Sequence, residues 1–332
     1  MTLTLVIPGL LWPRQVMRDT LYDTDFPALQ TLLGKGSRLA STGASADAWW
    51  CSHLGIGPAE FVAAPLRLHA LGKETGDSTW LCADPVHLQA DEHGATLKDP
   101  ALLPINAEEA AQLHAMLAPL FAEMGELVVT TPSQWHLRLT TPVPALPDRL
   151  YDFVEHSAAA LLPQGDDGRR WRQLINEVQM SLHAHPINTE RDARGQAAIN
   201  SIALWGGGQM PEPQTNIRGT LFCDDPIVAG AGRLAGLQVE PLPTRLADMA
   251  TDCIVYWHRL LVPAASHDAQ AWREGLQQLN NDWLTPALAA LASGKLKRIE
   301  LHGFGDEDAV SLSMTSIDRY RFWRKPRRLE TL

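Results

Sequence analysis

The chain has 332 residues, of which 45% are hydrophobic and 20% are charged, and its formal net charge is -10. This composition excludes a disordered chain, and the length fits one large α/β domain or a core that carries an inserted subdomain. The acidic balance repels phosphate backbones, so we expect no nucleic acid as a partner.

The targeting and cysteine signals both point to the cell interior. No apolar run approaches the roughly 18 residues of a membrane span, and the N-terminal stretch has no basic region and meets Pro8 early. We therefore expect neither a signal peptide nor a membrane anchor. No CxxC pair is present, and Cys82, Cys223 and Cys253 lie in apolar runs. This pattern predicts buried, reduced thiols and a cytoplasmic location.

Strands and helices are predicted in alternation from the N-terminus. The first strand, 2–7, is apolar on both faces, as in a buried parallel strand, and a helix follows at 26–36. Further apolar runs predict strands at 80–86, 126–132, 135–140, 200–208, 219–225, 252–263, 298–304 and 309–316. The spacing of apolar residues predicts further helices at 106–125, 169–186 and 272–294, the last kinked near Pro286.

This alternation indicates an α/β fold with a mostly parallel sheet and helices on both faces. A helix and two strands at 87–145 interrupt it with a local α+β unit. We therefore predict a core formed by residues 1–59 and 169–332, with an inserted α+β subdomain at 60–168.

The densest cluster of polar residues lies at 183–208, between a helix end and a predicted glycine loop. Ligands of open α/β sheets bind at the carboxyl ends of strands, glycine loops bring backbone N–H groups to anions, and arginine binds phosphate or carboxylate. The predicted ligand-binding residues of this stretch are His185, Asn188, Arg191, Asn200, Trp205, Gly206, Gly207 and Gly208. The alternative is structural, with the polar residues capping the helix and the glycines turning the chain.

A second polar stretch follows the predicted strand at 80–86. Asp84 and His87 are the ligand-binding candidates here, because a carboxylate and an imidazole can orient a ligand or hold a metal. The alternative is a turn built from its usual residues. Trp135 and His136 are neighbours in another predicted strand, so they cannot both face one cleft.

Several of these residues keep the order and spacing of a known motif. His185-Pro186, Asn188, Arg191, Gly195, Asn200 and the three glycines resemble the motif of archaeal-type cofactor-independent phosphoglycerate mutases, which belong to the alkaline phosphatase superfamily. Weaker likenesses at 26–36, 44–58, 230–237 and 279–291 extend the resemblance over most of the chain. The variant with the WGGG loop and the RFWRKPR tail resembles the RpfE-type regulatory proteins. The resemblance implies an alkaline-phosphatase-like core with an inserted subdomain.

The same resemblance implies chemistry that this chain departs from. The family uses two divalent metals, usually manganese, and a nucleophilic serine. Its first metal-binding aspartate falls on Pro8, its serine on Ala46 and its helix aspartate on Asn280, while only His302 survives of a late ligand segment. Proline and alanine cannot bind a hard cation, and asparagine is a poor substitute for a carboxylate. We therefore expect no cofactor, no metal ligand and no catalytic residue.

Three hypotheses for function remain. The first is a degenerate mutase-like protein that binds a small anionic or phosphorylated ligand in a regulatory or sensory role. The second is an active metal-dependent mutase or phosphatase, with Ser45 as a shifted nucleophile or with Mn or Zn held by a shifted ligand pair, His267 and Asp268. The third is a partner-binding protein that uses its tryptophans and the basic cluster at 319–328. The alternative interpretation of that cluster is a solvated tail. The sequence identifies no protein partner.

Overall fold

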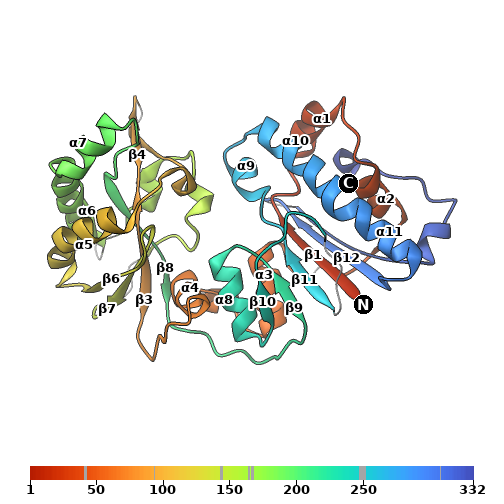
Figure 1. Cartoon of the computed structure of the whole chain (residues 1–332), viewed down its shortest axis with the longest axis horizontal. Helices are drawn as coiled ribbons and strands as arrows, with labels where there is room; N and C mark the ends of the chain where they lie inside the picture. Colours follow the sequence, from red (N-terminus) through yellow and green to blue (C-terminus); the bar gives the residue numbers. More distant parts are fainter. Residues whose placement is uncertain are drawn as a thin grey trace. The chain divides into compact units, whose positions relative to one another are not determined.

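The computed structural model describes residues 1–40, 43–92, 94–142, 145–163, 165, 168–246, 252–306 and 308–332. The chain divides into two compact units (Figure 1). Unit 1 consists of Met1–Pro58 and Glu212–Leu332, and unit 2 consists of Ala59–Pro211.

Unit 1 is built on a seven-stranded sheet with the order β10-β9-β11-β1-β12-β13-β2. The strands are β1 (Thr2–Pro8), β2 (Ser37–Arg38), β9 (Thr220–Phe222), β10 (Gln238–Glu240), β11 (Cys253–Tyr256), β12 (Arg298–Phe304) and β13 (Ala309–Thr315). Pairing is parallel from β10 to β12 and antiparallel at β13 and β2. The predicted α/β class with a mostly parallel sheet is confirmed.

Helices cover both faces of this sheet, as predicted. They are α1 (Arg14–Leu21), α2 (Pro27–Lys35), α3 (Ala46–Leu54), α8 (Pro226–Leu234), α9 (Leu261–Ala265), α10 (Ala269–Gln278) and α11 (Thr285–Ser293). Leu3, Leu5 and Ile7 of β1 share a core with α1, α2, α10 and α11, and Figure 1 shows α10 and α11 running along the sheet. The intervening residues of the sheet face the other way, where Trp49 of α3 packs beside His302.

The predicted kink of the helix at 272–294 is a π-helical segment, Leu279–Leu284, between α10 and α11. The predicted strand at 252–263 was too long, because β11 ends at Tyr256 and α9 begins at Leu261. Trp257 and Leu260 are buried in the turn after β11, whereas the residues of α9 are half-buried, and an apolar run alone does not separate these states from a strand.

Unit 2 is built on an antiparallel sheet with the order β6-β7-β3-β8 and a separate hairpin of two strands. The strands are β3 (Trp80–Val86), β4 (Leu88–Asp91), β5 (Gly94–Leu97), β6 (Gly125–Thr131), β7 (Gln134–Leu139) and β8 (Ser201–Gly208). The helices are α4 (Ala63–Ala70), α5 (Ala107–Phe121), α6 (Gly168–His183) and α7 (Pro186–Ala193). Trp135, Leu137 and Leu204 face the core shared with α5 and α6, and α4 packs on the opposite face.

The structure differs from the predicted boundary of the insertion. Unit 2 ends at Pro211 and not at residue 168, because α6 packs on α5 and β8 pairs with β3 along Val86–Trp80. The strand at 200–208 therefore belongs to the antiparallel sheet. This removes one premise of the predicted ligand site, since that stretch does not lie at the carboxyl end of a parallel strand.

The four cysteines form no disulfide and are buried, as the apolar context predicted for three of them. Burial raises the pKa of each of Cys82, Cys223 and Cys253, which keeps these thiols protonated. Across the described ranges, no helix combines the length and the apolar character needed to cross a membrane.

Candidate functional site

Asp84, a predicted ligand-binding residue, lies at the centre of a buried polar network in unit 2. Arg67 of α4 donates to both carboxylate oxygens of Asp84, at 2.7 and 2.9 Å. The backbone N–H of Trp135 and the indole N–H of Trp205 donate to the same carboxylate, at 2.9 and 3.0 Å. Asp84 therefore accepts four hydrogen bonds from within the protein, and Trp205 contributes one of them.

Arg67 was not among the predicted site residues, although it is only 2% exposed. Burial alone lowers the pKa of a guanidinium, but the charge of Asp84, its hydrogen bonds and the nearby Cys82 and Tyr151 together outweigh that effect and raise the pKa of Arg67. The side chain also lies 5.3 Å from the Trp205 ring centroid. An arginine inside the apolar run AAPLRLHA was the available signal, because such a residue requires a buried partner.

His136 belongs to the same network and is neutral. Burial, with the charge of Arg67, lowers the pKa of His136 to about 2. Its Nε2 accepts from Arg67 Nε at 3.0 Å, so Nδ1 carries the proton and donates to the Thr130 hydroxyl at 3.0 Å. As predicted, Trp135 and His136 point to opposite faces of β7.

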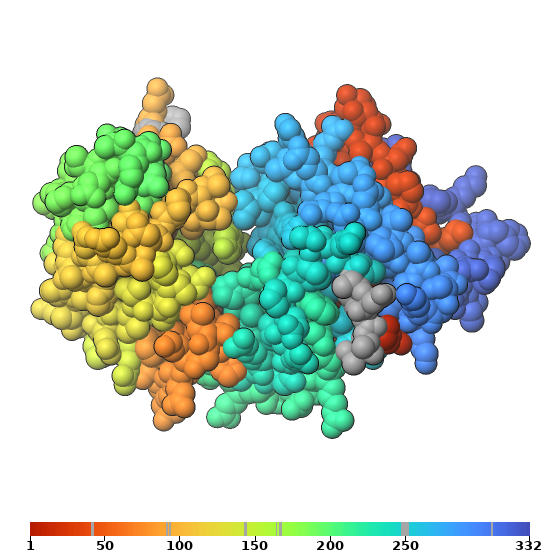
Figure 2. All heavy atoms as spheres, viewed as in Figure 1, coloured from red at the N-terminus to blue at the C-terminus, as the bar shows by residue number. Residues whose placement is uncertain are grey.

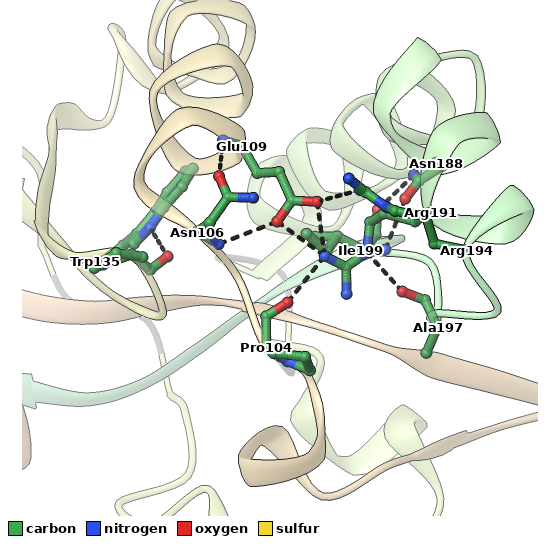
Figure 3. Close-up of polar contacts among 10 residues, drawn as sticks. Pro104, Asn106, Glu109, Trp135, Asn188, Arg191, Arg194, Ala197 and Ile199 are labelled. Atoms are coloured by element: carbon green, nitrogen blue, oxygen red, sulfur yellow. Dashed lines mark hydrogen bonds and ion pairs between the residues drawn. The ribbon is translucent and has the colours of Figure 1, made fainter.

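Arg191 forms a second buried network, drawn in Figure 3. Its guanidinium is fully buried and donates to both carboxylate oxygens of Glu109, each at 3.1 Å, and to the carbonyls of Pro104 and Ala197. Glu109 also accepts from the backbone N–H of Asn106, completing the capping box at the start of α5. Arg191 thus joins α7 to the start of α5 and to the chain before β8.

The two predicted asparagines bind backbone groups in the manner of a peptide unit. Asn188 accepts from the N–H of Ile199 and donates to the Ile199 and Leu182 carbonyls. Asn200 accepts from the N–H of Leu88 and donates to its carbonyl, both at 2.8 Å. These bonds hold the turn before β8 in place and occupy both amides.

The two predicted histidines also have structural partners. A ring nitrogen of His87 lies 2.8 Å from the Ala198 carbonyl oxygen, and His185 caps α7 by accepting from the N–H of Ile187. The helix α7 itself was missed, because Pro186 was interpreted as the end of α6 when it occupies the first turn of the next helix.

The predicted glycine loop, Gly206–Gly208, is part of strand β8. A side chain on Gly206 would meet the Ala63 side chain at 2.5 Å, and one on Gly208 would meet Val62 at 2.7 Å. The glycines therefore let the start of α4 approach the strand closely. The predicted residues of unit 2 thus lie around two structural networks, and their role in ligand binding stays a prediction.

A second region is the edge of the unit 1 sheet at which β1, β9, β11 and β12 all end, called here the carboxyl edge. Parallel α/β sheets bind ligands at such an edge. The positions that the mutase resemblance assigns to metal or nucleophile lie on elements of unit 1, and their local bonds are structural. Ser45 caps α3 by accepting from the N–H of Ala48, and Asp268 caps α10 by accepting from the N–H of Ala271.

Asn280 shows most clearly that a position assigned by the resemblance to a metal ligand has a structural role here. It is 3% exposed, and its side-chain oxygen accepts from the N–H groups of Ala28 and Leu29 in the first turn of α2, at 3.0 and 3.2 Å. Its side-chain nitrogen donates to Asn281. The amide thus caps the start of a helix from 252 residues away in the sequence.

His302 lies two residues before the end of β12 and is 5% exposed. One ring nitrogen lies 2.9 Å from the Ser311 hydroxyl, and the ring packs against Trp49, which stacks on His53. Burial, together with the charge of His53, lowers the pKa of His302 to about 4, and burial also lowers the pKa of His53. Both rings are therefore neutral near pH 7.

The residues present do not fit the two divalent metals that the resemblance implies. Within the described ranges, no group of three or more His, Cys, Asp or Glu side chains is placed to hold a metal. Pro8 offers no ligand atom on its side chain, and Asn280 is directed to α2. Gly9, which follows Pro8, has a backbone role, since it has φ +74° and a side chain there would meet the Leu260 carbonyl oxygen.

A cavity of about 210 Å³ opens beside the end of β1 and the start of β13. Leu11, Met17 and Val310 supply apolar surface, and the side chains of Arg14 and Arg38 line the same cavity. The lining also includes Asp308, Ala309 and Leu332. Among the bonds of the described residues, none joins the guanidinium of Arg14 or Arg38 to another group, so both charges are available to an anion.

Comparisons with known proteins were made at three levels. No protein-family model matches the chain. In sequence, 108 residues are 32% identical to 2,3-bisphosphoglycerate-independent phosphoglycerate mutase 2 of Methanothermobacter thermautotrophicus, over 31% of this chain and 27% of that protein. A longer stretch of 213 residues is 29% identical to the corresponding mutase of Methanosarcina barkeri, over 59% of this chain and 51% of that protein.

The chain thus spans between about a quarter and a half of the length of these relatives. In structure, it is similar to the PH0037 protein from Pyrococcus horikoshii, with a TM-score of 0.50 and 14% identity over 99% of this chain and 91% of that one. That likeness concerns the fold alone. In sequence, the chain is a distant relative of archaeal cofactor-independent phosphoglycerate mutases.

Proposed function

We propose that this chain is a mutase-like protein of the RpfE type that has lost the two-metal centre, and that it binds a small organic anion in a regulatory or sensory role. The observation that carries the proposal is the cavity at the carboxyl edge, whose lining combines apolar side chains and Asp308 with Arg14 and Arg38, neither of which has an ion-pair partner among the described residues. Two guanidinium groups beside apolar side chains suit a short phosphorylated or carboxylated metabolite.

The distant similarity to phosphoglycerate mutases suggests the first ligand to test. A relative that keeps affinity for such an anion, but lacks ligands for the metals, binds it without turnover and can report its concentration. The metal-dependent alternative requires a hard cation to displace at least one structural bond, for example the bond from Asn280 to α2.

The test is calorimetric titration of the chelator-treated protein, first with Mn²⁺ and then with 3-phosphoglycerate in the presence of chelator. We expect no heat from Mn²⁺ and saturable heat from 3-phosphoglycerate. Arg38→Ala should weaken the binding of 3-phosphoglycerate by about tenfold or more, as the loss of a charge-assisted hydrogen bond does.

Arg18→Ala is the matched control, because Arg18 is exposed on the same helix as Arg14 but does not line the cavity. A Mn²⁺ site of roughly micromolar affinity, on the order of -8 kcal/mol, would overturn the loss of the metal centre and favour an active enzyme. Phosphoglycerate binding that is equal in Arg38→Ala and the wild type would remove the cavity from the proposal.

A further inference from the structure

Residues 317–328, which follow β13, expose an unusual amount of apolar surface. Of the nine large apolar side chains that are exposed in the described part of the chain, four lie in this segment. They are Ile317, Tyr320, Phe322 and Trp323, and the exposed fractions of Phe322 and Trp323 are 86% and 67%. The two rings meet edge to face, with centroids 5.1 Å apart.

The basic cluster of this segment is held against unit 1, which differs from the predicted alternative of a solvated tail. Arg321 pairs with Asp318 and donates to the Ser37 hydroxyl, both at distances below 3 Å. Arg324 donates to the Gly36 carbonyl at 2.9 Å, and Arg328 donates to the Leu21 carbonyl at 2.6 Å. These bonds satisfy carbonyls at the ends of α1 and α2. Figure 2 shows the last part of the chain on the surface.

Gly34 of α2 shows how closely the segment packs. A side chain on Gly34 would lie within 2.1 Å of the Lys325 carbonyl oxygen and 2.8 Å of Pro326 Cα, both of them backbone atoms. The backbone N–H of Arg327 also donates to the Gln30 carbonyl on the same helix. The exposed aromatic side chains are thus presented by a backbone that is already fixed, which lowers the entropy lost on binding.

The charge of the segment indicates the chemistry of a partner. Residues 317–330 carry six arginine or lysine side chains and two carboxylates, in a chain whose net charge is -10. A symmetric dimer through this surface would bring like charges together. All five arginines of the segment donate to backbone carbonyls, which holds these side chains against unit 1 and away from lipid headgroups. Trp, Tyr and Arg are the residues that dominate protein–protein interfaces.

The segment starts away from the candidate ligand site of unit 1, although Arg321 bonds Ser37, the neighbour of the cavity residue Arg38. Thr315, the last residue of β13, pairs with Arg298, the first residue of β12. The segment therefore begins at the edge of the sheet opposite to the carboxyl edge.

We propose that Ile317, Tyr320, Phe322 and Trp323 form a docking surface for an acidic protein segment that inserts apolar side chains between them. The test is selection of a displayed library of random peptides against the full-length protein. Selected peptides should combine Asp or Glu with aromatic or aliphatic residues. A synthetic copy of the best one should bind at least about tenfold more weakly to Trp323→Ala and to Phe322→Ala, as loss of a hot-spot side chain does, and more weakly at high salt.

Tyr22→Ala is the matched control, because Tyr22 is an aromatic residue of unit 1 that is 73% exposed outside this surface; its substitution should leave binding unchanged. Gly34→Ala keeps every aromatic side chain but displaces the backbone beneath them, and should also weaken binding. Selected peptides that lack acidic residues, or that bind Trp323→Ala as tightly as the wild type, would overturn the proposal. So would Trp323-dependent binding to phosphatidylserine vesicles, or Trp323-dependent self-association, without peptide binding.

Discussion

The charged residues of unit 2 and those at the carboxyl edge of unit 1 are used in opposite ways. In unit 2, Arg67 and Arg191 are almost fully buried, and each is paired with a carboxylate. At the carboxyl edge, Arg14 and Arg38 are exposed and line a cavity. A buried arginine that is already paired stabilises a fold, whereas an exposed and unpaired arginine can still bind a ligand.

The contrast between the two regions changes which part of the sequence is the better candidate for ligand binding. The stretch 183–208 has the densest polar pattern in the sequence, yet its side chains bind backbone groups and the buried carboxylates of Glu109 and Asp84. The residues that line the cavity belong to no recognisable motif. The density of polar residues in a sequence therefore did not distinguish a buried polar network from an open binding site.

The largest effect is expected from breaking a buried pair. Arg67→Ala leaves the carboxylate of Asp84 buried without its counter-charge and should lower the free energy of unfolding by about 3–5 kcal/mol. Urea denaturation measures this change. Arg170→Ala, which removes an exposed ion pair with Glu123, should cost less than about 1 kcal/mol. An equal loss of unfolding free energy in the two variants would mean that the burial of Arg67 contributes nothing to stability.

An intermediate effect is expected at Asn280. Asn280→Ala leaves the N–H groups of Ala28 and Leu29 without a partner and should cost about 1–2 kcal/mol of unfolding free energy. Asn280→Asp keeps an acceptor in the same place and should restore most of that stability, because a carboxylate is favourable at a helix N-terminus. Calorimetry of the Asp variant should show no Mn²⁺ binding. A gain of Mn²⁺ binding would show that one carboxylate suffices to rebuild a metal site.

His302 should make stability depend on pH. Burial lowers its pKa from 6.5 to about 4, so the unfolded chain binds a proton more readily than the folded one between these values. Its contribution to stability is complete above about pH 6.5 and is lost as the pH falls toward 4, by at most about 1.4 kcal/mol per pH unit. Denaturation at several pH values should show a flatter slope in His302→Gln than in the wild type. An unchanged slope would assign the dependence to other groups.

The smallest effect on stability is expected at the cavity. Arg38→Ala should change the free energy of unfolding by less than about 0.5 kcal/mol, because the side chain is exposed and forms no hydrogen bond or ion pair with the described residues. Thermal denaturation measures this change in the absence of ligand. A cost similar to that of Arg67→Ala would place Arg38 in the scaffold and end the contrast between the two regions.

Much of the fold could be predicted from local patterns. Apolar runs predicted β1, β3, β12 and β13, and the helical spacing of apolar residues predicted α5. The sheet to which β8 belongs could not be predicted, since an apolar strand pairs equally well in either sheet. Only the pairing of β8 with β3, over more than 100 residues of sequence, decides it.

The candidate sites were harder to predict for a related reason. The sequence shows that Arg191 and Glu109 are charged but not that they meet, because their partnership depends on how α7 packs near the start of α5. Arg14 and Arg38 come together at the cavity only after β2 joins the edge of the sheet. Long-range packing therefore decides which charged side chains are paired and which remain available to a ligand.

The close packing of Gly34 against Lys325 and Pro326 links two positions that are nearly 300 residues apart in sequence. Neither position can accept an arbitrary change alone, since even one methyl group on the helix would force the C-terminal backbone away. In homologous chains these positions should therefore vary together: a relative with a larger residue in place of Gly34 should carry a C-terminal segment of different length or course.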